Sequence, residues 1–89
     1  MKAIVTVIGM DKPGIVATVS TSLAECNVNI TDISQYYAGE FFTMIMVVDF
    51  STSKATLKQV DNKLKSACEK IGVFVSIQHE DIFRAMHRI

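Results

Sequence analysis

Residues 8–16 (IGMDKPGIV) constrain the fold most, because they join an apolar, β-branched run to a run with helical periodicity. They predict a strand that turns directly into a helix. Gly9 and Gly14 permit backbone conformations that other residues avoid. Asp11 can accept hydrogen bonds from the first N–H groups of a helix, and Pro13 suits a first helical turn. We therefore expect the helix to begin here.

The start of this helix is a candidate anion site. Its first N–H groups lack partners within the helix and lie at the positive end of the helix dipole. Gly14, Ile15 and Val16 can therefore present donors to a small carboxylate, and Gly14 leaves room for close approach. The alternative is an ordinary capped helix start without a ligand, because capping residues are common.

Length and charge exclude several classes of protein. Eighty-nine residues predict one domain, spanning 1–89. Nine Lys and Arg residues balance nine Asp and Glu residues, so the chain lacks the basic surface that attracts nucleic acid or an anionic membrane, and we expect neither partner. No uncharged apolar run approaches the roughly 18–20 residues that span a bilayer, which predicts a cytoplasmic protein.

The cysteine and histidine pattern predicts no metal or other cofactor. Cys26 and Cys68 each lie in a segment of helical periodicity, at a spacing typical of neither a metal site nor a disulfide scaffold, and we expect both to be buried thiols. A segment near the end has suitable metal ligands, but its spacing matches no known site and favours a solvated tail. Those ligands are His79, Glu80, Asp81 and His87.

Apolar periodicity predicts the first three elements. Residues 2–8 are apolar on both faces except at Thr6, which indicates a central strand. Residues 15–26 have helical spacing. Residues 28–37 alternate as a strand, but the phase slips at Thr31 and Asp32, which predicts a β-bulge. In the helix we expect one apolar side (Ile15, Val19, Leu23, Cys26) and one polar side (Thr18, Thr21, Ser22, Glu25).

The second half of the chain repeats the same kinds of element. Residues 38–40 (AGE) are a turn signal, so residues 41–50 should fold back as the second strand of a hairpin. Residues 51–53 (STS) predict a polar link and a helix N-cap, and an apolar stripe over 57–71 then predicts a helix ended by Gly72. Val73, Val75 and Ile77 alternate as a fourth strand, and Asp81 is expected to cap a short last helix.

The order β-α-β-β-α-β predicts an α+β, ferredoxin-like sandwich. Its four-stranded antiparallel sheet should carry both long helices on one face, because right-handed crossovers place them on the same side. The other face would be bare, yet Phe41, Ile45 and Val47, or alternatively the apolar residues of the first strand, must lie on it. Exposed apolar area of this kind predicts a homodimer.

These residues resemble the ACT domain family, small ligand-binding modules found on many enzymes and regulators of amino-acid metabolism. The resemblance rests on the strand ending 7–9 (VIG), the turn 11–16 (DKPGIV), the segment 27–30 (NVNI) with Asp32 and Ile33, and the order of elements. It is closest to small stand-alone ACT proteins, and to the ACT portions of the glycine-cleavage-system repressor and of formyltetrahydrofolate hydrolase. Residues 82–89 (IFRAMHRI) also resemble the tails of the stand-alone proteins.

The resemblance implies an amino-acid sensor in which two domains pair, with the ligand between the turn of one subunit and the second strand of its neighbour. The ligand's carboxylate would meet the helix N–H groups, and its ammonium would need an acceptor. Alternatively, Asp11 caps the helix, Asn29 is a turn residue and Asp32 stabilises the bulge. The candidate ligand-binding residues are Asp11, Gly14, Ile15, Val16, Asn29 and Asp32.

Because no catalytic or DNA-binding domain accompanies these residues, the expected sensor would signal to a partner protein in trans. A ligand-free interaction or dimerisation module is the main alternative. Acylphosphatase-like enzymes share the fold, but they use an arginine in the first turn, where this chain has only Lys12. We therefore predict no catalytic residues and no enzyme. RNA-recognition domains also share the strand order, and Phe41 and Phe42 invite that comparison, but flanking basic residues are missing.

Overall fold

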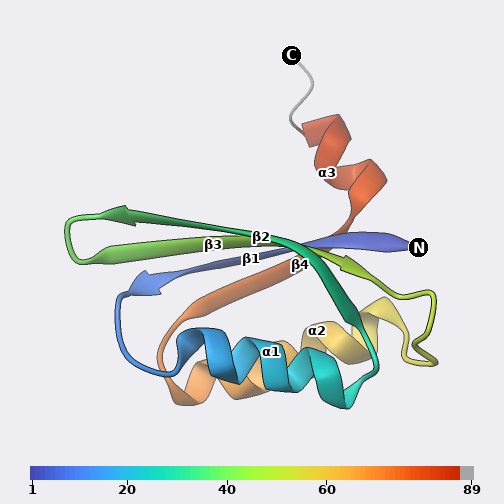
Figure 1. The fold of residues 1–89 in the computed structure, drawn as a ribbon, viewed down its shortest axis with the longest axis horizontal. Coiled ribbons are helices and arrows are strands. Elements are labelled where there is room, and N and C mark those ends of the chain that lie inside the picture. Colours follow the sequence, from blue (N-terminus) through green and yellow to red (C-terminus); the bar gives the residue numbers. More distant parts are fainter. Residues whose placement is uncertain (87–89) are drawn as a thin grey trace.

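The computed structural model describes residues 1–86 and confirms the predicted ferredoxin-like sandwich (Figure 1). The antiparallel sheet has the order β2-β3-β1-β4. Helices α1 and α2 cover one face, and the short α3 projects on the other side (Figure 1). The elements are β1 Lys2–Met10, α1 Ile15–Glu25, β2 Asn29–Ala38, β3 Phe41–Asp49, α2 Leu57–Lys70, β4 Phe74–His79 and α3 Glu80–Met86.

The core lies between the sheet and the two long helices. β1 pairs with both β3 and β4, which confirms that it is a central strand. Alternate residues of the strands point toward the helices, as the period of two requires. The fully buried side chains include Val5 and Val7 of β1, Phe42, Met44, Met46 and Val48 of β3, Val19 and Leu23 of α1, and Val60, Leu64 and Cys68 of α2.

Two predictions about α1 need correction. Ser22 is buried rather than solvated, and its hydroxyl donates to the carbonyl of Thr18 at 2.9 Å, so its polar group is satisfied inside the helix. Cys26, just past the helix end, is half-exposed rather than buried. Cys68 is fully buried, as predicted, and burial raises the pKa of its thiol.

The β2–β3 hairpin and its bulge confirm the sequence pattern. The turn between the strands contains Gly39 in the left-handed region at φ 62°. The register between β2 and β3 shifts between Ile30 and Asp32, so Thr31 is the extra residue of the bulge. The Thr31 hydroxyl donates to the carbonyl of Val47 at 3.1 Å and holds the bulge against β3.

The cap of α2 lies later than predicted. Thr56, not the segment 51–53, is the N-cap, and it forms a capping box with Gln59. Thr52 and Ser53 instead donate from their hydroxyls to the carbonyls of Asn27 and Cys26, at 3.0 and 2.6 Å. These side chains therefore fasten the β3–α2 loop to the end of α1.

The start of α3 also differs from the prediction. The helix begins at Glu80, so Asp81 lies inside its first turn and does not cap it. The ring of His79 takes that role, because its Nδ1 accepts from the N–H of Asp81 at 3.1 Å. His87 lies outside the described residues.

Candidate functional site

The turn between β1 and α1 leaves the helix start open. Gly14 is the N-cap, in the left-handed region at φ 90°, and within residues 1–86 no side chain caps the helix. Asp11 is exposed, and its backbone N–H donates to the carbonyl of Glu40 at 2.8 Å. Pro13 precedes the cap. The alternative in which Asp11 caps α1, and the prediction that Pro13 lies in its first turn, are therefore wrong.

The three predicted donors at this helix start have different surroundings. Ile15 points into the core and anchors the first turn, whereas Gly14 and Val16 are exposed. A Cβ atom added to Gly14 would meet no atom within 4 Å. The start of α1 therefore has no side-chain cap and has free space beside Gly14, and its first N–H groups lie at the positive end of the helix dipole, where a small anion is favoured.

Lys12 has a role that the sequence did not reveal. Its Nζ donates to the carbonyl of Ile71 at 2.7 Å, just past the end of α2. A cation is favourable there because the carbonyl end of a helix carries partial negative charge. The only cation of the first turn is thus bonded to α2 and is not placed over the start of α1.

Gly9 is required for a different reason from the one predicted. Its backbone is not in the left-handed region, in contrast to that of Gly14. Instead, a Cβ atom at Gly9 would lie 2.7 Å from Cγ1 of Val73, closer than real contacts allow. Gly9 therefore lets the end of β1 pack against the α2–β4 turn.

The structure divides the candidate ligand-binding residues into two groups. Asp11, Gly14, Ile15 and Val16 lie around the start of α1, near the hairpin tip, whereas Asn29 and Asp32 lie among the first residues of β2, which follows the other end of α1 (Figure 1). The 11 residues of α1 span about 16 Å at 1.5 Å per residue. Within one chain the two groups are therefore too far apart to contact the same amino-acid ligand.

Asp32 is engaged within the bulge. Its Oδ1 accepts from the N–H of Ile33 at 2.9 Å, although the side chain is exposed. This contact matches the bulge-stabilising interpretation of Asp32. Asn29 is also exposed, and its side-chain amide makes no hydrogen bond to another residue within 1–86, so this amide is the better placed of the two for a ligand.

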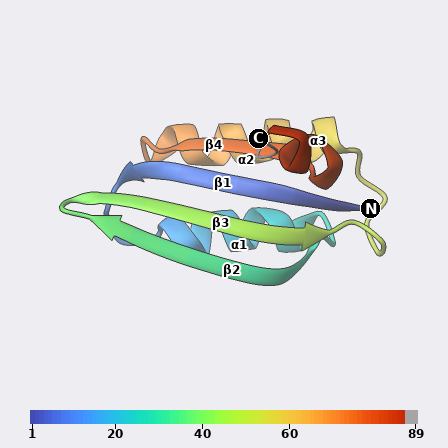
Figure 2. The same ribbon diagram turned by 90° about the horizontal axis from the view of Figure 1, so that it is seen from above.

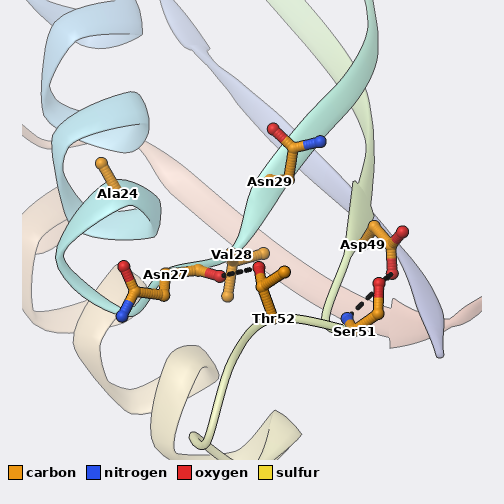
Figure 3. A pocket seen from close by; sticks show the side chains of 7 residues that line it. All are labelled: Ala24, Asn27, Val28, Asn29, Asp49, Ser51 and Thr52. Atoms are coloured by element: carbon orange, nitrogen blue, oxygen red, sulfur yellow. Dashed lines mark hydrogen bonds between the residues drawn. The ribbon is translucent and has the colours of Figure 1, made fainter.

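Asn29 borders an open pocket of about 480 Å³ between the end of α1 and the β3–α2 loop (Figure 3). Asn29 and Asp49 are register partners on β2 and β3, so their side chains share one face of the sheet. Sequence reasoning missed Asp49 and Ser51, because only the strand register brings them to Asn29. The lining residues are Ala24, Asn27, Val28, Asn29, Asp49, Ser51 and Thr52.

Asp49 is held as a carboxylate in this pocket. Its Oδ1 accepts from the hydroxyl of Ser51 at 2.7 Å and from the N–H of Ser51 at 2.9 Å (Figure 3). These bonds, the hydroxyl first, hold the pKa of Asp49 below its ordinary value, and the charges of the N-terminus and Lys2 act in the same direction.

Ser51→Ala is expected to raise the pKa of Asp49 toward its ordinary value, because the stronger of the two bonds is lost. A carboxyl with a lowered pKa in the folded state stabilises the fold above its unfolded pKa of about 3.9, and this contribution is lost as the pH falls through the folded value. The variant should therefore lose less stability between neutral and acidic pH. NMR titration of Asp49 checks the shift, and an unchanged pKa would contradict it. Ser66→Ala on α2 is the control.

Other kinds of site find little support within residues 1–86. No group of three or more His, Cys, Asp or Glu side chains there is arranged to hold a metal ion. His79 and Asp81 form a single pair, with Nδ1 and Oδ2 3.6 Å apart. Phe42 is buried, so only Phe41 of the predicted aromatic pair is exposed for stacking. No described helix is long and apolar enough to cross a membrane.

The fold defines a class: a small ferredoxin-like α+β domain whose first helix begins at a glycine N-cap without a side-chain cap. Comparison with known proteins makes this specific. The ACT domain model matches residues 2–78, and the chain belongs to the ACT domain family. A UPF0237 protein from Methanopyrus kandleri is 50% identical over 88 residues, which cover 99% of this chain and 98% of the relative.

Solved structures agree with this assignment. An ACT domain protein from Streptococcus pneumoniae is 44% identical with a TM-score of 0.81, covering 93% of both chains. A formyltetrahydrofolate deformylase from Pseudomonas syringae is 27% identical (TM-score 0.74), covering 88% of this chain and 27% of its own. The regulatory subunit of aspartate kinase from Thermus thermophilus is 25% identical (TM-score 0.68), covering 88% and 50%. A glycine cleavage system transcriptional repressor shares the fold at 22% identity and a TM-score of 0.73.

Proposed function

We propose that this chain is a regulatory ACT protein that binds a small amino acid or related carboxylate at a homodimer interface. The observation that carries the proposal is the open start of α1, where no side chain caps the helix and the space at the Cβ position of Gly14 is free. A carboxylate is the natural partner of such donors. The likeness to the regulatory subunit of aspartate kinase supports a regulatory role.

A two-fold dimer through β2 would unite the two groups of candidate residues. β2 is an edge strand of the sheet, and α1 lies beneath this edge (Figure 2). Antiparallel pairing of two β2 edges would bring the hairpin end of one copy to the opposite end of the other. Gly14 of one copy would then approach Asn29 of its partner, and the ligand would contact both copies.

In this proposal each subunit supplies half of the ligand's contacts. The helix N–H groups of Gly14, Ile15 and Val16 would bind the carboxylate. Asn29 of the neighbour would accept from the ammonium, with Asp11 and Asp32 as nearby carboxylates that favour its positive charge. The ligand would stabilise one dimer geometry, and a partner protein in the cytoplasm that prefers this geometry would be bound more tightly.

We propose a regulatory role rather than a catalytic one. The acylphosphatase-like alternative needs a cation at the first turn, but Lys12 is bonded to the carbonyl of Ile71. Arg84, the only arginine within the described residues, lies on α3 near Glu80.

Thermal unfolding in the presence of each of the twenty amino acids and related acids tests the proposed function. A ligand at a hundred times its Kd stabilises the folded state by about 2.7 kcal/mol per site, which shifts the midpoint of so small a domain by roughly 10 °C or more. We expect one or two compounds to give this shift. If none does, the ligand-free interaction module becomes the better explanation.

Asn29→Ala then tests the site for the compound identified. Asn29→Ala should reduce the ligand-induced shift, because the ammonium loses an acceptor. Asn62→Ala is a matched control, because Asn62 is exposed on α2 away from both groups of candidate residues. Equal shifts in the two variants would remove Asn29 from the site.

A further inference from the structure

The pocket beside Asn29 has a lining that suits a cation. Among the described residues that line it, Asp49 alone is charged. Asp49 is held as a carboxylate, because its Oδ1 accepts from both the hydroxyl and the N–H of Ser51, at 2.7 and 2.9 Å (Figure 3). A pocket whose lining carries one negative charge attracts a positively charged group.

The hydroxyl groups of the pocket are already used as donors. The Ser51 hydroxyl donates to Asp49, and the Thr52 hydroxyl donates to the backbone carbonyl of Asn27 at 3.0 Å (Figure 3). A hydroxyl has one proton to donate, so both of these oxygens can only accept a further hydrogen bond. The lining is therefore rich in acceptors. It matches an ammonium group, which donates three hydrogen bonds and accepts none.

The second oxygen of Asp49 is available to such a group. Within residues 1–86, both hydrogen bonds of the carboxylate go to Oδ1, and Oδ2 makes none. Lys2 is the register partner of Asp49 on β1, but the ion pairs among the described residues join other groups. The charges of Lys2 and the N-terminus act on Asp49 only from a longer distance.

Asn29 and Asp49 are spaced to hold one nitrogen between them. They are register partners, and cross-strand partners have Cβ atoms about 4.5–5.5 Å apart. A nitrogen at a charge-assisted hydrogen-bond distance of about 2.8 Å from an oxygen of each side chain bridges this separation. Asp32 is less well placed, because it pairs with Val47 beyond the bulge and does not line the pocket.

The pocket also lies where the proposed dimer would bring the second copy. β3 is next to the edge strand β2, so Asp49 is one strand, about 4.8 Å, from that edge. Ala24 of α1 lines the same pocket, which therefore reaches the side of the sheet that α1 covers. In a dimer paired through β2, the start of the partner's α1 approaches from this side.

We propose that Asp49, together with Asn29, binds the α-ammonium group of the ligand, so that the site selects α-amino acids over carboxylates without an amino group. This inference rests on the proposed function, which includes both kinds of acid. The helix N–H groups of one copy bind the carboxylate, and Asn29 and Asp49 of the other bind the ammonium. An acid without the ammonium leaves the charge of Asp49 without a partner.

Matched pairs of acids test the inference. Each amino acid that raises the midpoint of thermal unfolding is compared, by calorimetric titration, with the 2-hydroxy acid of the same side chain: glycine with glycolate, alanine with lactate, serine with glycerate. The wild type should bind the amino acid at least roughly 10-fold more tightly, because hydrogen bonds between charged groups are lost in the hydroxy acid.

Asp49→Asn removes the charge and retains an oxygen that accepts from Ser51. It should weaken binding of the amino acid by roughly 10-fold or more, whereas the hydroxy acid should bind equally well or better. A purely structural role of Asp49 would weaken both acids equally. Asp61→Asn is the matched control, because Asp61 pairs with Lys65 on α2, and it should leave both affinities unchanged.

The outcomes separate this inference from the proposed function. If the wild type binds an amino acid and its hydroxy acid equally, or if Asp49→Asn affects both acids alike, the carboxylate site stands and the role of Asp49 is wrong. If neither kind of acid binds the wild type, the proposed function fails and this inference fails with it. Circular dichroism verifies folding, and Asp49→Ser, at a position outside the core, is a second variant for the same comparison.

Discussion

Gly9→Ala is expected to lower the free energy of unfolding by about 1–3 kcal/mol, and Gly9→Val by more, because both overpack a closed contact. The added Cβ would lie 2.7 Å from Cγ1, 3.1 Å from Cβ and 3.4 Å from Cα of Val73. The strand cannot move away easily, since Gly9 is also the register partner of Phe42, which is buried. Chemical denaturation measures the loss.

A double-mutant cycle shows whether Val73 causes this loss. In a Val73→Ala background the contact at 2.7 Å is removed and those at 3.1 and 3.4 Å remain, so Gly9→Ala should cost less than in the wild type. If Gly9→Ala lowers the free energy of unfolding equally in the two backgrounds, the contact with the Val73 side chain does not explain the requirement for glycine.

The elements could be predicted because their apolar periods are strong. Apolar residues alternate at Val73, Val75 and Ile77, and only a strand buries all three on one face. Val60, Leu64 and Cys68 recur at helical spacing, and only a helix buries all three on one face. The slip of phase at Thr31 was enough to locate the bulge, because a one-residue shift moves every later side chain to the other face.

The caps were predicted less well, since polar residues near a helix start are common and only geometry selects one. Asp11 and Asp81 have suitable side chains, but neither occupies the N-cap position. For α2 the sequence did contain a usable signal: Thr56 followed three residues later by Gln59 is the capping-box pattern.

The contacts that the first turn makes with distant residues could not be predicted from the local sequence. Lys12 and Ile71 are 59 residues apart, and their bond depends on how α2 ends beside the turn. Gly9 and Val73 meet for the same reason. Gly14 and Asn29 lie near opposite ends of α1. Apolar periodicity predicts the length of this helix, but it does not show whether residues near its two ends contact the same ligand.

Gly14→Val is expected to weaken binding of the amino acid identified by thermal unfolding by roughly 100-fold, while the chain still folds. A side chain at Gly14 would occupy the open space in front of the N–H groups and exclude the carboxylate. Hydrogen bonds to a charged group contribute about 1.5–3 kcal/mol each, so loss of one or two should weaken binding by roughly 100-fold. Calorimetric titration of wild type and variant measures the ratio.

Gly39→Val separates this effect from backbone strain. Gly14 and Gly39 both have positive φ, at 90° and 62°, and an added Cβ meets nothing within 4 Å at either position. Their valine variants should therefore lose comparable stability, of about 1–3 kcal/mol, from strained backbone. Only Gly14→Val should lose the ligand, because Gly39 lies at the hairpin tip and not at a helix start. If folded Gly14→Val binds the ligand with unchanged affinity, the ligand site lies elsewhere. If both valine variants lose ligand affinity equally, backbone strain explains the loss.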